Sequence, residues 1–137
     1  MRNWRARRAM TPDEVRYLAL TTYRRDGRPV TTPVWAAALR GKLYVVTASD
    51  TGKARRIRAN GRVRFAPCSM SGRRILGPWQ EGAARIVEDT ARREEALTAL
   101  QRKYGWQMSL AMFVYRRRGQ YADRVVLELA ATSGTTH

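Results

Sequence analysis

The stretch Leu18–Trp35 decides the fold, and it reads LALTTYRRDGRPVTTPVW. Apolar and β-branched runs at its two ends predict strands, and Asp26-Gly27 between them is a strong signal for a β-hairpin. The returning strand is expected over Val30–Leu39, with Pro33 inside it. Because proline has no backbone N–H to donate to a neighbouring strand, Pro33 predicts a sheet edge or a bulge at that point.

Turn signals divide the rest of the chain into more short strands. Arg40-Gly41-Lys42 and Met70–Arg73 are typical of tight turns between antiparallel strands. The expected strands, in chain order, are Leu18–Thr22, Val30–Leu39, Leu43–Thr47, Val63–Ser69, Trp79–Glu88 and Arg124–Leu129. Many short strands of this kind close into a barrel. We therefore predict a mainly β (α+β) fold, a six-stranded antiparallel barrel with two or three peripheral helices.

The helices are expected outside the sheet. A capping-box pattern predicts a short helix over Thr11–Tyr17. A second helix is expected over Lys53–Asn60, with Gly61 ending it in the left-handed conformation. Thr90–Tyr104 has the best helical spacing in the chain, and a glycine follows it. Within the fifth strand, Gly82 is a candidate bulge.

No repeat or linker marks a domain boundary. We expect a basic arm over residues 1–10, one barrel domain over 11–130 and a disordered tail over 131–137. Trp106–Val114 has no clear secondary-structure type, and Tyr115–Asp123 is expected to be a basic loop.

The chain is strongly basic, with 27 Lys and Arg against 11 Asp and Glu and a formal net charge of +16. Only Lys42, Lys53 and Lys103 are lysines. Such a charge suits an anionic partner: nucleic acid, a membrane surface or a polyanionic cofactor. It is also what an arginine-rich composition with mostly solvated side chains would produce, and most of the arginines fit that second interpretation.

Several classes of protein are not expected. No apolar run approaches the ~20 residues that span a bilayer, and no signal peptide is recognised, so we predict a cytoplasmic protein without a membrane partner. The single cysteine, Cys68, fits a reducing compartment. The single histidine is His137, so neither an imidazole-based catalytic triad nor a zinc site is expected. Any redox chemistry would have to come from a bound cofactor.

One segment has the features of a phosphate site. Around Thr51-Gly52-Lys53 a strand ends, a small polar loop follows, and a helix begins with lysine. A helix N-terminus offers free N–H groups and a partial positive charge, and Arg56 shares the helix face of Lys53. The alternative is an ordinary capped, basic surface helix, which composition alone favours slightly.

The order of motifs resembles a known superfamily. The matching segments are LALTTYRRDGRPVTTPVW (Leu18–Trp35), TGKARRIRAN (Thr51–Asn60), VRFAPC (Val63–Cys68) and RKYGW (Arg102–Trp106). Together they resemble the pyridoxamine 5'-phosphate oxidase-like proteins, and more narrowly the branch of oxidoreductases that depend on coenzyme F420. The resemblance covers roughly Arg16 to Leu129.

The resemblance implies a split β-barrel, a homodimer, and a cofactor at the dimer interface. It implies that Thr51, Gly52, Lys53 and Arg56 bind the cofactor's phosphate. It implies that the flat ring lies along Thr32, Pro33, Val34, Trp35 and Thr47. The partner subunit would close the site with an aromatic residue, either Trp79 or Trp106, although core or interface packing is the more common role of a single tryptophan.

Three functions remain open at this point. The first is an F420-dependent oxidoreductase that transfers hydride to or from a small organic substrate. The second is an FMN-dependent oxidase or reductase with the same fold. The third is a non-catalytic cofactor carrier or nucleic-acid binder, although specific nucleic-acid binding is not expected because no recognised motif is present. No catalytic residue is assigned, and Tyr23, Tyr44 and Tyr104 are candidate proton donors by residue type only.

Overall fold

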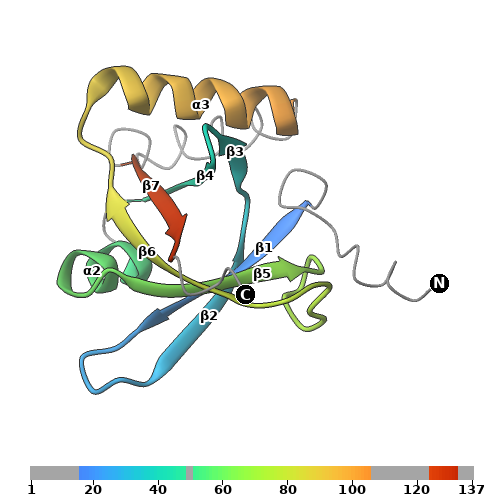
Figure 1. Cartoon of the computed structure of the whole chain (residues 1–137), viewed down its shortest axis with the longest axis vertical. Helices are drawn as coiled ribbons and strands as arrows, with labels where there is room; N and C mark the ends of the chain where they lie inside the picture. The colour runs from blue at the N-terminus through green and yellow to red at the C-terminus, as the bar shows by residue number, and fades with distance from the viewer. Residues whose placement is uncertain (1–15, 49–50, 106–123, 133–137) are drawn as a thin grey trace.

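The computed structural model describes residues 16–48, 51–105 and 124–132 (Figure 1). In chain order its elements are β1 (Tyr17–Tyr23), β2 (Pro29–Val34), β3 (Ala37–Leu39), β4 (Lys42–Ala48), α2 (Gly52–Ala59), β5 (Arg62–Cys68), β6 (Gln80–Ile86), α3 (Thr90–Tyr104) and β7 (Arg124–Ala131). The fold is therefore mainly β with two described helices, as the sequence predicts.

All the described strands form one antiparallel sheet of seven strands, in the order β2-β1-β5-β6-β7-β4-β3. The two edge strands, β2 and β3, are separated in the chain only by Trp35 and Ala36. In a flat sheet, six strand spacings would put these edges about 29 Å apart. The link from Val34 to Ala37 spans at most about 11 Å. The sheet must therefore curl until its edges meet, which makes it a split β-barrel.

This closure corrects the predicted strand count. The expected strand Val30–Leu39 is two strands, one at each edge of the sheet. Pro33 lies in β2 opposite Ala19, so the prediction of an edge position is correct. The chain leaves the ladder just after it, at Trp35, because it crosses there from one edge to the other.

The inner face of the curled sheet forms the main core. Leu20 lies opposite Phe65, Val45 lies opposite Leu127, and all four side chains are buried. Since opposite residues point to one face of a sheet, these pairs fill the interior of the barrel. Ile57 of α2 packs into the same cluster, so this helix covers one end of the barrel.

Helix α3 packs on the other face, across β3 and β4 (Figure 1). Its last residue, Tyr104, anchors the crossing between the two sheet edges. The Trp35 ring stacks on the Tyr104 ring, with centroids 4.6 Å apart and planes 10° apart. The Tyr104 hydroxyl accepts from the Ala36 N–H at 3.0 Å and donates to the carbonyl of Arg16 at 2.9 Å. The end of α3 thus holds the two-residue crossing, Trp35 and Ala36, between the two edges of the sheet.

Two glycines have a different role from the predicted one. Gly61 does not end α2 in the left-handed conformation; Asn60 ends it with extended backbone. A Cβ on Gly61 would lie 2.7 Å from the Ala84 carbonyl oxygen of β6. Gly82 is not a bulge, because it pairs with Val63 and the pairing continues on both sides of it, with Glu81 opposite Arg64 and Ala83 opposite Arg62. Both positions need glycine because another strand's backbone is too close for a side chain.

Of the predicted helix over Thr11–Tyr17, Arg16 is in a bend and Tyr17 begins β1, whereas residues 11–15 lie outside the described residues. Residues 106–123 also lie outside them, as does the predicted tail beyond Thr132. Ala131, which we had placed in that tail, is the last residue of β7.

Candidate cofactor site at helix α2

Helix α2 begins where the sequence predicts a phosphate site. Thr51 caps it, and its Oγ1 accepts a hydrogen bond from the Ala54 N–H at 3.2 Å. The same Oγ1 lies 3.4 Å from Oγ1 of Thr47, at the end of β4. The first turn of α2 contains no acidic residue. The helix start therefore keeps its partial positive charge, which favours anions.

Arg56 folds back over the start of its own helix. Its Nε donates to Oγ1 of the buried Thr22 at 2.6 Å. A Cβ on Gly52 would lie 2.6 Å from the Arg56 Nη1, so glycine leaves room for the guanidinium there. Side chains in a helix lean toward its N-terminus, which explains why a residue four positions later reaches this point.

The cations at this site repel one another. Burial, and then the charge of Arg56, lower the pKa of the half-buried Lys53. Burial, and then the charges of Arg24 and Arg55, lower the pKa of Arg56. These shifts mean that positive charges have been placed close together and partly out of water. An anion bound between them would relieve that repulsion.

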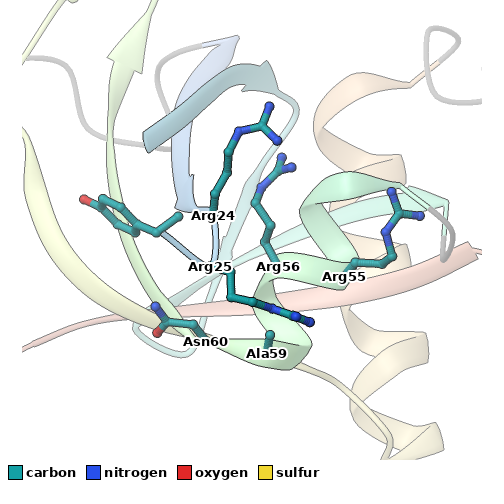
Figure 2. A pocket seen from close by; sticks show the side chains of 7 residues that line it. Arg24, Arg25, Arg55, Arg56, Ala59 and Asn60 are labelled. Atoms are coloured by element: carbon teal, nitrogen blue, oxygen red, sulfur yellow. The ribbon is translucent and has the colours of Figure 1, made fainter. Parts of the chain in front are cut away.

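A pocket of about 500 Å³ continues from Arg56 along α2 (Figure 2). Its lining residues are Tyr23, Arg24, Arg25, Arg55, Arg56, Ala59 and Asn60. Four of these are arginines and none is acidic. Figure 2 shows Arg24 and Arg56 extending in the same direction from two different elements.

The β1–β2 hairpin contributes Thr22, Arg24 and Arg25 to this site, which the local sequence does not predict. Arg24 and Arg25 follow β1 directly, and Thr22 is near its end. The only local signal was a pair of arginines before the Asp-Gly turn. That signal did not indicate a position in space, because nothing in the local sequence predicts that this turn lies beside α2.

The residues predicted to lie along a flat ring do not share one surface. Thr32 lies opposite Leu20, so it faces the barrel interior, and Val34 is on the same side. Pro33 points to the opposite face, where a Cβ on Gly72 would lie 3.3 Å from its ring. Oγ1 of Thr32 is buried and has no hydrogen-bond partner among the described residues.

The other two predicted ring residues lie apart. Thr47 is buried beside Thr51, so the structure brings it to the helix start. Trp35 is engaged by Tyr104, as described above. The structure thus gathers Thr47, Thr51, Gly52 and Arg56 into one group and leaves Trp35 outside it.

The two tryptophans predicted to close the site, Trp79 and Trp106, differ in what the structure describes. Trp79 is half-buried, and the Arg64 guanidinium lies 4.4 Å from the centre of its ring. Trp106 lies outside the described residues.

The three tyrosines named as candidate proton donors, Tyr23, Tyr44 and Tyr104, have different surroundings. Tyr44 donates its hydroxyl proton to Glu128 at 2.7 Å, and burial with this hydrogen bond raises the pKa of Tyr44. The Tyr104 hydroxyl is engaged at the crossing. Both have structural roles, which leaves Tyr23 as the tyrosine that lines the pocket.

Within residues 16–48, 51–105 and 124–132, no three His, Cys, Asp or Glu side chains cluster as metal ligands would. None of the helices described there is long and apolar enough to cross a membrane.

An antiparallel sheet that curls until its two edges meet defines a split β-barrel protein. The sequence model of the pyridoxamine 5'-phosphate oxidase family matches residues 7–137, and the chain belongs to this family. No curated protein sequence matches the chain at a significant level.

Solved structures share the fold at low sequence identity. The conserved hypothetical protein Rv2991 from Mycobacterium tuberculosis is 22% identical over 87% of this chain and 74% of its own, with a TM-score of 0.66. HutZ, a heme storage protein from Vibrio cholerae, is 16% identical over 90% of this chain and 86% of its own, with a TM-score of 0.69. A protein described as an F420 reductase is 22% identical over 85% and 86%, with a TM-score of 0.54.

Proposed function

We propose that this protein is an oxidoreductase that uses coenzyme F420 to transfer hydride to or from a small organic substrate. The observation that carries the proposal is the group of cations around the start of α2, with no carboxylate in the adjoining pocket. F420 has an anionic phosphate and an anionic glutamyl tail, and charge-assisted hydrogen bonds to such groups are strong. Family membership and the fold shared with an F420 reductase support the same choice.

The residues present fit a phosphate-bearing ligand. Lys53 and Arg56 supply charge, and the α2 N-terminus supplies N–H groups. Thr32 adds a buried hydroxyl that lacks a partner among the described residues. A buried polar group without a partner costs about 1–3 kcal/mol, so a ligand atom that bonded to it would be favoured. Thr32 and Thr22 lie on the same face of the sheet, because Thr32 is opposite Leu20, two residues before Thr22 in β1. Thr22 in turn accepts the hydrogen bond from Arg56.

When bound, F420 supplies the two-electron hydride chemistry, which no side chain of this protein can provide. The protein's own contribution is binding and orientation. In our proposal Thr51, Gly52, Lys53 and Arg56 hold the phosphate. Of the predicted ring residues, Thr32, Pro33 and Val34 belong to β2 and Thr47 belongs to β4, and in our proposal the ring lies along these two strands, whereas Trp35 stays stacked on Tyr104. We propose Tyr23, which lines the pocket, as the tyrosine that exchanges a proton with the substrate.

We propose in addition that the site is completed by a second copy of the chain. The loop between β5 and β6 exposes Met70, Ile75 and Leu76 at 70%, 40% and 38%. Gly72 of the same loop lies against Pro33 on the predicted ring strand. An exposed apolar loop beside the ring strand suits a homodimer interface, and the partner's Trp79 or Trp106 would then close the site. Sedimentation that gave a monomer at high protein concentration would contradict this part of the proposal.

The decisive experiment is a titration with F420, followed by its fluorescence, with FMN in parallel. We expect tight binding of F420 and weak binding of FMN. Tight FMN binding instead would make the protein a flavin-dependent oxidase or reductase that uses the same phosphate residues. Binding of neither would remove the proposed function and leave the third class, a non-catalytic binder, to be tested with nucleic acid.

A further inference from the structure

The pocket in Figure 2 is larger than one phosphate needs, and it lies at the other end of α2. The predicted phosphate residues begin at Thr51, whereas the pocket reaches Ala59 and Asn60. The eight residues of α2 rise by about 12 Å. Arg56 belongs to both regions, because its guanidinium reaches back over Gly52 and the residue also lines the pocket.

The charges in this pocket are not balanced by the acidic residue nearest to them in the chain. Asp26 follows Arg25 directly, but it pairs with Arg28 at 2.8 Å and does not line the pocket. Arg24 and Arg55 repel Arg56, and because arginine keeps its proton at any physiological pH, this repulsion is not relieved by loss of charge. The pocket also lies toward the C-terminal end of α2, where the helix dipole disfavours an anion. Attraction there must come from the side chains.

We infer that this pocket is a second anion site, for a ligand in which two or more phosphate or carboxylate groups follow one another in a chain. Each guanidinium offers a planar pair of donors that matches such a group. The volume is in the range of pockets that hold small molecules. Either an anionic extension of the ligand at the α2 N-terminus or a free polyanion would supply this chemistry. Only the first source rests on the proposed function.

The site is tested without any cofactor, by calorimetric titration of the full chain with inorganic tripolyphosphate. The variant is Arg24→Gln with Arg25→Gln. The described hydrogen bonds of Arg24 are made by its backbone, so the hairpin turn should keep its shape. The matched control is Arg40→Gln with Arg102→Gln, because both side chains are exposed and lie on the α3 side of the barrel, outside the pocket and outside the loop proposed as the dimer interface. It removes the same net charge from a different place.

We expect the Arg24/Arg25 variant to bind tripolyphosphate at least about tenfold more weakly than the wild type, because hydrogen bonds to charged groups are the strong ones. The control should stay within about twofold, since exposed charges at a distance are largely screened by salt. Equal weakening in both variants would overturn the site, because it would mean that only the overall charge attracts the anion. Absence of binding to the wild type would overturn it as well.

A second titration distinguishes the two sources. It compares F420 with several glutamates and the form that has the phosphate but no glutamates. A gain in affinity from the glutamates that disappears in the Arg24/Arg25 variant would identify the cofactor's tail as the ligand. No gain in the wild type would exclude the tail and leave a free polyanion. If F420 does not bind and tripolyphosphate does, the proposed function fails and this site stands.

Discussion

Two regions of this barrel use arginine in opposite ways. On the α3 side, Arg85 bonds to Glu128 at 2.8 Å and Arg40 bonds to Glu95 at 2.8 Å. Beside α2, four arginines line one pocket with no carboxylate among its lining residues. The chain has 11 acidic residues for 27 basic ones, so carboxylates are scarce in it. The difference teaches that paired arginines here hold the fold together, whereas the concentrated ones of the pocket suit a ligand.

The paired region is centred on Glu128, which is only 5% exposed. Tyr44 donates to one carboxylate oxygen at 2.7 Å, and Arg85 donates to the other at 2.8 Å. Arg92 lies 3.8 Å from the first oxygen and bonds to the Tyr44 hydroxyl at 3.2 Å. These contacts join β4, β6, β7 and α3 through one carboxylate. Since a buried carboxylate is stable only when its oxygens are satisfied, this network ties the helix to the sheet.

The largest effect is expected from Lys53→Ala combined with Arg56→Ala. Each removes a charge-assisted contact worth about 1.5–3 kcal/mol, so F420 affinity should fall about 100-fold or more. Stability should change little, because relief of the repulsion around Arg56 offsets its lost bond to Thr22. Fluorescence titration and urea unfolding measure the two quantities, with Arg40→Gln/Arg102→Gln on the α3 side as the control. Unchanged affinity would remove the phosphate site and the contrast between the two regions.

Glu128→Gln should have the reverse signature. It replaces a buried carboxylate that accepts a hydrogen bond on each of its oxygens. The free energy of unfolding should fall by about 2–3 kcal/mol, while F420 affinity stays the same. Glu95→Gln is the control, because its pair with Arg40 is exposed and worth at most about 1 kcal/mol. A Glu128 variant as stable as the wild type would mean that the network does not support the fold.

The same variant has an expected pH dependence. Burial alone would raise the pKa of Glu128, but hydrogen bonds from Tyr44 and Arg85 and the charges of Arg85 and Lys42 hold that pKa below its usual value. The resulting stability is present above the unfolded pKa, which is about 4.3, and is lost as pH falls through the folded pKa. The stability difference between wild type and Glu128→Gln should therefore shrink below about pH 4.3. A constant difference down to pH 3 would contradict this assignment.

A smaller effect is expected at the crossing between the sheet edges. Tyr104→Phe keeps the ring that stacks on Trp35 but leaves the buried Ala36 N–H without its acceptor. An unsatisfied buried donor costs about 1–3 kcal/mol, and a water molecule that enters the gap would bring the loss toward the lower figure. Urea unfolding measures it, and Tyr17→Phe, at a half-buried position in β1, is the comparison. An equal loss in both variants would indicate that the hydroxyl has no special role.

The smallest effect concerns the pH range of binding. Burial and the charge of Arg56 lower the pKa of Lys53 below 10.5, so it loses its charge at a pH where an ordinary lysine keeps it. F420 affinity should therefore decline on the alkaline side before pH 10.5 is reached. Lys53→Arg should bind with similar affinity at neutral pH and remove this decline, since arginine stays protonated. An unchanged alkaline decline in that variant would assign it to another group.

Local sequence determined the elements. Helix α3 has the predicted bounds, Thr90–Tyr104, because helical spacing and a following glycine are signals that neighbouring residues carry. Gly27 and Gly105 have the positive φ that the turn and the helix end require. The Thr51 cap and the basic start of α2 were visible in the same way. All of these depend on φ and ψ preferences and on contacts between residues close in the chain.

Tertiary structure decided the rest. Closure of the sheet split Val30–Leu39 between two edges and placed the Arg24-Arg25 turn against α2. It also required glycine at positions 61 and 82, where another strand's backbone approaches. Whether an arginine meets a carboxylate or another arginine depends on register and curvature across the whole sheet, and no local preference encodes either of them. The sequence therefore determined that this protein is basic, and the closed barrel decided where that charge is concentrated.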